Sequence, residues 1–309
     1  MKFLTKCLIV VSILISNAIA QDIQIYTANN ANGKITPKSI EKAFKDAGFY
    51  ITMHNDMNLA FKGKFDKTNH KVYNLMAVHK EDIAFRLIKD NPDAGLITPL
   101  SMSIYTDKGS NDISLSSISL DGMVKITGIS KTNKDLVELS NLLKSTIKKA
   151  LPNGNFEKLS YKILKPEAEL ISRFEGEMEV EPKELEEEIE SMQEELEGSL
   201  ETGGFVIAGF NNFNDALKES GNNKYDFFDA YSICKISVIY EVSKKYPEAG
   251  ALAPCTFYMY KEKGSITMKM AFPSVYNWIS SLDITDPQAK EVLIKAQNVF
   301  AAAVKDTIE

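Results

Sequence analysis

Hydrophobic and polar positions follow the same order twice along the chain. In the first half, alternating apolar residues predict five strands, and apolar residues spaced at three and four predict three helices. The strands are expected at 23–26, 49–53, 72–78, 101–105 and 113–118. The helices are expected at 37–47, 80–90 and 136–147. The resulting order is β-α-β-β-α-β-β-α.

The second half repeats this order with one large departure. Strands are expected at 170–174, 256–260 and 266–270, and a closing helix begins at Asp286-Pro287, an N-cap followed by proline at the first helical position. The departure is the first helix, 182–201, which is longer and strongly acidic. The pattern predicts an α+β fold made of two diverged copies of one module, with mostly antiparallel sheets and helices packed on one face.

Direct self-comparison supports the duplication. Residues 73–110 align with 228–265 without a gap, and ten of the 38 positions are identical. The identities include the string Pro-acidic-Ala-Gly-x-x-x-Pro, at 92–99 and 247–254, and a later Lys-Gly-Ser turn. Proline and glycine restrict or permit particular backbone conformations, so their repetition indicates a repeated backbone.

The N-terminal residues predict an exported protein. Lys2 and Lys6 precede a short apolar run at 7–15, and Ala18-Ile19-Ala20 has the small-x-small pattern of a signal-peptide cleavage site. Cleavage after Ala20 would give a periplasmic or secreted protein; an uncleaved membrane anchor is the alternative. No later run reaches 18 apolar residues, so no transmembrane segment is expected in the mature form.

We therefore expect four segments, listed in chain order: signal peptide 1–20, first module 21–151, linker 152–167 and second module 168–309.

Composition and charge narrow the class of protein. The chain is 44% hydrophobic and 25% charged, as in ordinary globular proteins, and its net charge is −6. Residues 175–201 hold 13 Glu and one Lys. A solvated helix face explains this run best, with metal binding or partner docking as alternatives. An acidic exported protein is not expected to bind nucleic acid.

Three residues are candidates for chemistry. Cys234 and Cys255 flank the second helix of the second copy, and His79 occupies in the first copy the position of Cys234. The cysteines fit two buried small side chains, a structural disulfide, or a redox or metal-ligand pair. His79 fits a core or capping residue, or a ligand that bridges the two equivalent sites. No spacing identifies a metal or a cofactor.

Other polar and aromatic residues suggest structural roles. Asn55 and Asn58 match Asn211 and Asn214, and turn chemistry explains them better than the lining of a groove between modules. His54 and His70 are expected at the surface. The aromatic residues after the last strand are expected to pack in the core or at a sheet edge, and they are Phe272, Tyr276 and Trp278.

Each copy resembles the bacterial and archaeal family known as domain of unknown function 302. The resemblance rests on residues 77–110 and 231–268, and in particular on Cys234 and the Ala253-Pro254-Cys255 step. The first copy departs from it with His79 and Leu100. The resemblance implies an α+β fold similar to that of TATA-binding protein, and it implies no activity.

Two functions remain open from the sequence. We favour a non-catalytic ligand-binding or envelope-accessory protein, whose paired modules form a groove about a pseudo-two-fold axis. Its partner would be a small ligand or an envelope protein. The alternative is a redox or metal-handling protein that uses Cys234 and Cys255. No motif is specific enough to name a reaction.

Overall fold

The computed structural model describes residues 21–181 and 183–308, and the predicted signal peptide lies outside them. The first module consists of β1 (Ile23–Asn29), α1 (Pro37–Asp46), β2 (Tyr50–Asp56), α2 (Met57–Phe65), β3 (Val72–His79), α3 (Glu81–Asp90), the 3-10 helix η1 (Pro92–Ile97), β4 (Leu100–Thr106), β5 (Asp112–Ile118), α4 (Leu120–Thr127), α5 (Lys134–Ala150) and β6 (Asn155–Phe156).

The second module repeats this order with longer first and last helices. It consists of β7 (Ile171–Glu177), α6 (Leu185–Thr202), β8 (Val206–Asn212), α7 (Asn214–Glu219), β9 (Tyr225–Cys234), α8 (Ile236–Ser243), the 3-10 helix η2 (Pro247–Leu252), β10 (Cys255–Glu262), β11 (Thr267–Pro273), α9 (Val275–Ser281) and α10 (Pro287–Ile308).

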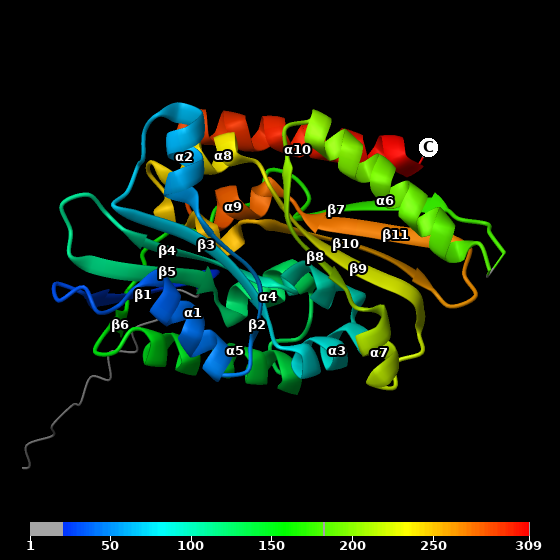
Figure 1. The fold of residues 1–309 in the computed structure, drawn as a ribbon, viewed down its shortest axis with the longest axis horizontal. Coiled ribbons are helices and arrows are strands. Elements are labelled where there is room, and N and C mark those ends of the chain that lie inside the picture. Colours follow the sequence, from blue (N-terminus) through cyan, green and yellow to red (C-terminus); the bar gives the residue numbers. More distant parts are fainter. Residues whose placement is uncertain (1–20, 182, 309) are drawn as a thin grey trace, which may run out of the picture.

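Each module has one antiparallel sheet. The first has the strand order β2-β3-β4-β5-β1-β6, and the second has the matching order β7-β11-β10-β9-β8. Figure 1 shows α1, α3 and α5 along one side of the molecule and α6, α8 and α10 along the opposite side, with the strands between. The predicted α+β fold, two antiparallel modules with helices, is confirmed.

Three pairs of short elements were absent from the predicted order: α2 and α7, η1 and η2, and α4 and α9. Each is too short to show a clear helical period in the sequence. The segment expected as a linker contributes β6, which pairs with β1 through Tyr26 and Thr27.

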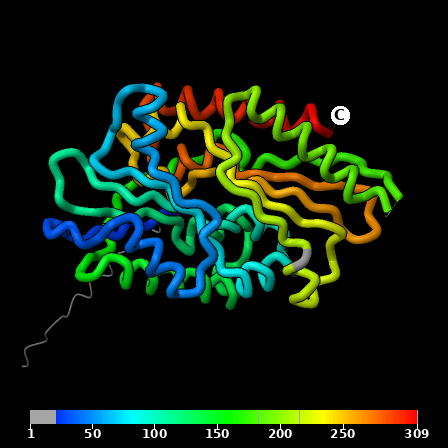
Figure 2. Tube along the Cα trace, viewed as in Figure 1, coloured from blue at the N-terminus to red at the C-terminus, as the bar shows by residue number. Residues whose placement is uncertain are grey.

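The two modules are joined by reciprocal contacts about a pseudo-two-fold axis. The Ser101 hydroxyl donates to the carbonyl of Pro254 at 2.8 Å, and the equivalent Thr256 hydroxyl donates to the carbonyl of Pro99 at 3.2 Å. η1 packs on β10 and β11, while η2 packs on β4 and β5. Figure 2 shows the two traces meeting along this central seam. The sheet of each module is therefore covered by its own helices on one face and by the 3-10 helix of the other module on the opposite face.

The repeated Pro-acidic-Ala-Gly string forms this seam. A Cβ atom at Gly95 would lie 2.8 Å from the Phe228 ring, and one at Gly250 would lie 2.3 Å from Cβ of Ser103. Real Cβ atoms do not approach other atoms so closely, because interiors are packed at contact distance. The glycines are therefore required by the approach of one module's backbone to the other's sheet.

Candidate functional site: a groove between the modules

An open groove of about 330 Å³ lies where the edge strands β2 and β8 approach each other. Its floor includes Leu75, Cys234 and Pro254, which are all buried. Its walls come from both modules and are Met53, Asn55, Asp56, Met57, Leu59, Ala60, Val206, Ala208 and Ile236. The groove is thus mostly apolar and shared across the seam.

Two large apolar side chains at the groove are left in solvent. Leu59 on α2 is 72% exposed, and Val206 on β8 is 44% exposed. α2 is set in place by Asp56, whose carboxylate accepts a hydrogen bond from the backbone N–H of Asn58 at 2.9 Å. Asn55 lines the groove, as in the less favoured interpretation of the asparagine pairs. A contiguous apolar hollow with exposed apolar walls is typical of a binding surface.

The pseudo-equivalent position on the other side of the seam is filled. There His79 packs with Tyr50 at 5.0 Å between ring centroids and with Phe213 of the second module at 5.5 Å. Phe213 stands where the open groove has Met57, and Tyr50 where it has Val206. The hydroxyl of Thr52 and Nδ1 of His79 lie 3.2 Å apart. The rings of Tyr50 and Phe213, packed on His79, therefore occupy the place that the open groove has on the other side of the seam.

His79 is held in its neutral form. Burial lowers the pKa of its imidazole to about 4, because a charged ring would lose its hydration. His79 lines neither of the two cavities that Cys234 lines. The position equivalent to Cys234 therefore serves packing at the seam in the first module.

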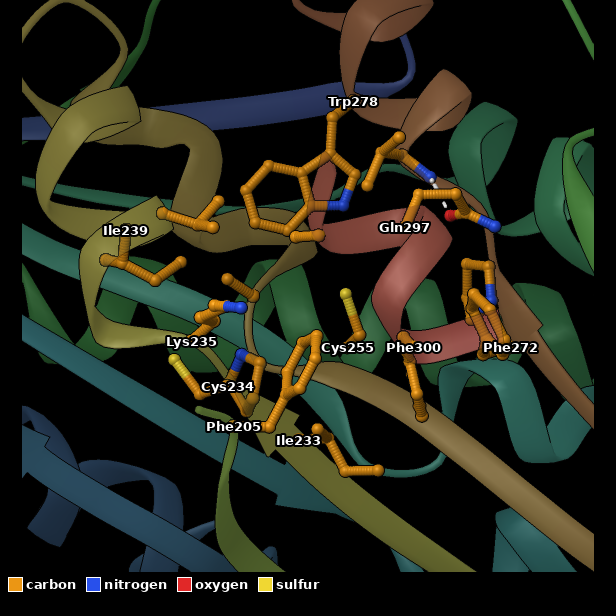
Figure 3. A pocket seen from close by; sticks show the side chains of 16 residues that line it. Phe205, Ile233, Cys234, Lys235, Ile239, Cys255, Phe272, Trp278, Gln297 and Phe300 are labelled. Carbon is orange, nitrogen blue, oxygen red and sulfur yellow. Dashed lines mark hydrogen bonds between the residues drawn. The ribbon is translucent and has the colours of Figure 1, made fainter. Parts of the chain in front are cut away.

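Cys234 also lines a second, smaller cavity inside the second module. Its volume is about 40 Å³, and Cys255, Trp278 and Phe300 lie around it. Figure 3 shows both sulfurs among aromatic and aliphatic side chains. Both thiols are free. Burial raises the pKa of each to about 12, so both are protonated at neutral pH.

These thiols are expected to resist alkylation in the folded protein. A thiolate is the reactive form, and a pKa of about 12 reduces its population at pH 8 by at least ~10²-fold relative to a free cysteine. Iodoacetamide labelling followed by mass spectrometry should find Cys234 and Cys255 unmodified in buffer and both modified in 6 M guanidinium, a standard denaturing concentration above typical unfolding midpoints. Rapid labelling of either in buffer would contradict this and favour a redox site.

Two histidines predicted at the surface are enclosed instead. His70 is 5% exposed; its Nδ1 lies 2.8 Å from Asp107 and its Nε2 lies 2.7 Å from the carbonyl of Ser243 in the second module. The His54 side chain is 10% exposed, with Nδ1 2.6 Å from Glu41. The surface prediction was wrong because the module seam and α1 cover a segment that reads as a polar loop. The prediction of core positions was right for Phe272 and Trp278.

Within the described ranges, no three His, Cys, Asp or Glu side chains gather closely enough to hold a metal ion. In the same part of the chain, no helix is long and apolar enough to cross a membrane. Sequence patterns did not reveal the groove residues Met53, Met57, Ala208 and Ile236, because each reads as an ordinary strand or helix position. The matched asparagines were the nearest available signal, since one of them, Asn55, lines the groove.

Comparison with known proteins identifies the family of this chain. The family model "Domain of unknown function DUF302" matches residues 27–150 and 182–303. An uncharacterized protein of Aquifex aeolicus (strain VF5) is 31% identical over 78 residues, which are 25% of this chain and 53% of that protein; the chain thus spans about half of this relative's length. The chain is also similar to a crystal structure of an uncharacterized conserved DUF302 protein from Bacillus stearothermophilus, with 20% sequence identity and a TM-score of 0.38. The superposition includes 46% of this chain and 100% of that one.

The matched segments fall one in each module and include both stretches on which the sequence resemblance rested. Together they cover well over half of the chain. The chain therefore belongs to the DUF302 family and carries two copies of its domain.

Proposed function

We propose that this protein is a non-catalytic binding protein that holds the apolar part of a small amphipathic molecule in the groove between its modules. The observation that carries this proposal is the open, mostly apolar hollow of about 330 Å³ lined by Met57, Val206 and Ile236. Ligand pockets of proteins typically measure roughly 300–1,000 Å³ and are predominantly apolar. The related position at His79 is filled, so one ligand per chain is expected.

The redox or metal alternative has weaker support. The two thiols are free and protonated, and they line a cavity of about 40 Å³, which has room for only a few waters. A metal ligand or redox nucleophile must be a thiolate. We further propose a periplasmic or secreted location, supported by the signal-peptide pattern at 1–20.

Filling the groove is expected to weaken binding of N-phenyl-1-naphthylamine, an uncharged probe that fluoresces in apolar sites. Ala208→Trp fills it from the second module and Ala60→Trp from the first, since both alanines line it. Each should weaken binding by at least about tenfold, because an indole occupies the space of the probe. Fluorescence titration of the purified mature protein measures this change.

Ile266→Trp is the matched control, because Ile266 is exposed on the turn before β11 and lines no part of the groove. It should bind the probe as the unmodified protein does. If both groove variants bind normally, or if the unmodified protein does not bind the probe, the proposed function is wrong.

A further inference from the structure

Three lysines lie on neighbouring segments beside the groove: Lys64 on α2, Lys235 just before α8 and Lys295 on α10. Lys235 lies between Cys234 and Ile236, which both line the groove, and its own side chain lines the small cavity. Lys64 lies one helical turn after Ala60 on α2, so the two share a helix face. Lys295 comes from α10. α2 and α10 both pack on α8, which Lys235 precedes, and burial followed by the charges of Lys295 and Lys64 lowers the pKa of Lys235.

None of the three lysines forms an ion pair with a residue in the described part of the chain. The ammonium of Lys235 donates to the carbonyl of Gly203 at 2.6 Å and lies 4.8 Å from the centre of the Phe205 ring. These contacts orient the side chain without neutralising its charge. An excess of positive charge therefore remains beside an apolar hollow.

The first module shows how the same position is neutralised when no ligand site is present. Lys80, the equivalent of Lys235, forms an ion pair with Asp82 at 3.1 Å, and Glu81 and Asp82 open α3. In the second module Ile236 and Ser237 replace these two carboxylates. The substitution removes negative charge and adds an apolar wall to the groove at the same point.

The N-terminus of α8 adds to this positive field. α8 has no side-chain cap and no acidic residue in its first turn. Free N–H groups at the start of a helix favour an anion. Asp56, the one carboxylate among the described residues of the groove wall, caps the start of α2, whereas Lys64 lies near its end, about 12 Å further along the helix axis.

Resting on the function proposed above, we propose that the ligand is a single-chain amphiphile with an anionic headgroup. Its hydrocarbon chain lies in the groove between the modules, and its headgroup lies among Lys64, Lys235 and Lys295. Apolar walls account for the chain, and charge complementarity accounts for the headgroup. A carboxylate of a free fatty acid and a phosphate of a lysophospholipid both have this chemistry.

Competition against bound N-phenyl-1-naphthylamine tests the proposal with ligands that share one acyl chain. Oleate and 1-oleoyl-lysophosphatidylglycerol are anionic, and monoolein is uncharged. At low salt we expect the better of the two anions to compete about tenfold more strongly than monoolein, with the preference reduced at high salt. Whichever anion competes better identifies the headgroup as carboxylate or phosphate.

The double variant Lys64→Gln/Lys295→Gln should lose most of this preference while still binding the uncharged probe. Both lysines are exposed, so their replacement leaves folding intact. Lys235→Gln should act in the same direction, and Lys80→Gln, which alters the equivalent neutralised position, should keep the preference. Equal competition by monoolein and the anions would overturn the headgroup assignment and leave the proposed function standing. Failure of the uncharged probe to bind would overturn both.

Discussion

Gly250→Ala is expected to lower the free energy of unfolding by about 3 kcal/mol, as overpacking of a tight interior contact does. The added Cβ would lie 2.3 Å from Cβ of Ser103 and 2.7 Å from Cδ2 of Leu75. Ser103 cannot move aside easily, because its hydroxyl donates to the carbonyl of Pro247 at 2.8 Å and lies 2.6 Å from the hydroxyl of Ser116. The modules must separate locally to admit one methyl group. Urea unfolding followed by circular dichroism measures the loss.

Gly198→Ala is the matched control for this change. Gly198 lies within α6, and a Cβ there would meet nothing within 4 Å. Alanine in an exposed helix interior should stabilise the protein by up to about 1 kcal/mol. Because Leu75 also forms the groove floor, Gly250→Ala should in addition weaken binding of the uncharged probe. A stability within about 0.5 kcal/mol of the unmodified protein would show that η2 does not pack as closely as described.

Asp229→Asn is expected to raise the free energy of unfolding by about 2 kcal/mol at pH 8, half of what the full pKa shift would give. Asp229 is 1% exposed on β9 and faces the helix layer. Gln193 donates to one of its carboxylate oxygens at 2.9 Å, and the other oxygen has no hydrogen-bond partner among residues 21–181 and 183–308. Burial raises the pKa of this carboxyl to about 7. The first module has Asn74 at the equivalent position, so the fold accepts the amide.

The gain should depend on pH in a defined direction. The folded state holds the Asp229 proton up to about pH 7, whereas the unfolded chain releases it near the usual value of 3.8. The unfolded state thus binds fewer protons between these values, and stability falls as the pH rises from about 4 to 7. The Asn variant lacks this fall, so the two proteins should be similar at pH 4 and differ most above pH 7.

Urea unfolding at pH 4, 6 and 8 measures this dependence, and Asp306→Asn, at an exposed position on α10, is the control. The control should change the stability by less than about 0.5 kcal/mol at any of these pH values. If Asp229→Asn instead destabilises the protein at pH 8, the charged carboxylate has favourable interactions that its unpartnered oxygen does not indicate, and the prediction is wrong.

The amino-acid sequence by itself determined the repeated module and its α+β class. Strands such as β3 and β5 and helices such as α1 and α5 carry local periodicities, which are visible without knowing what they pack against. The repeated Pro and Gly positions indicated a repeated backbone, because a single proline or glycine already limits or extends the backbone conformations available at its position.

Only the tertiary structure decided where those modules meet and which of the two related grooves stays open. The groove joins Met57 to Val206 and Ile236, which lie 149 and 179 residues further along the chain, and no local pattern relates them. Whether a groove opens or closes depends on the sizes of a few side chains, such as Met57 against Phe213, once the modules have docked. His70 and Asp229 are buried for the same reason, because burial depends on which distant surface covers a residue.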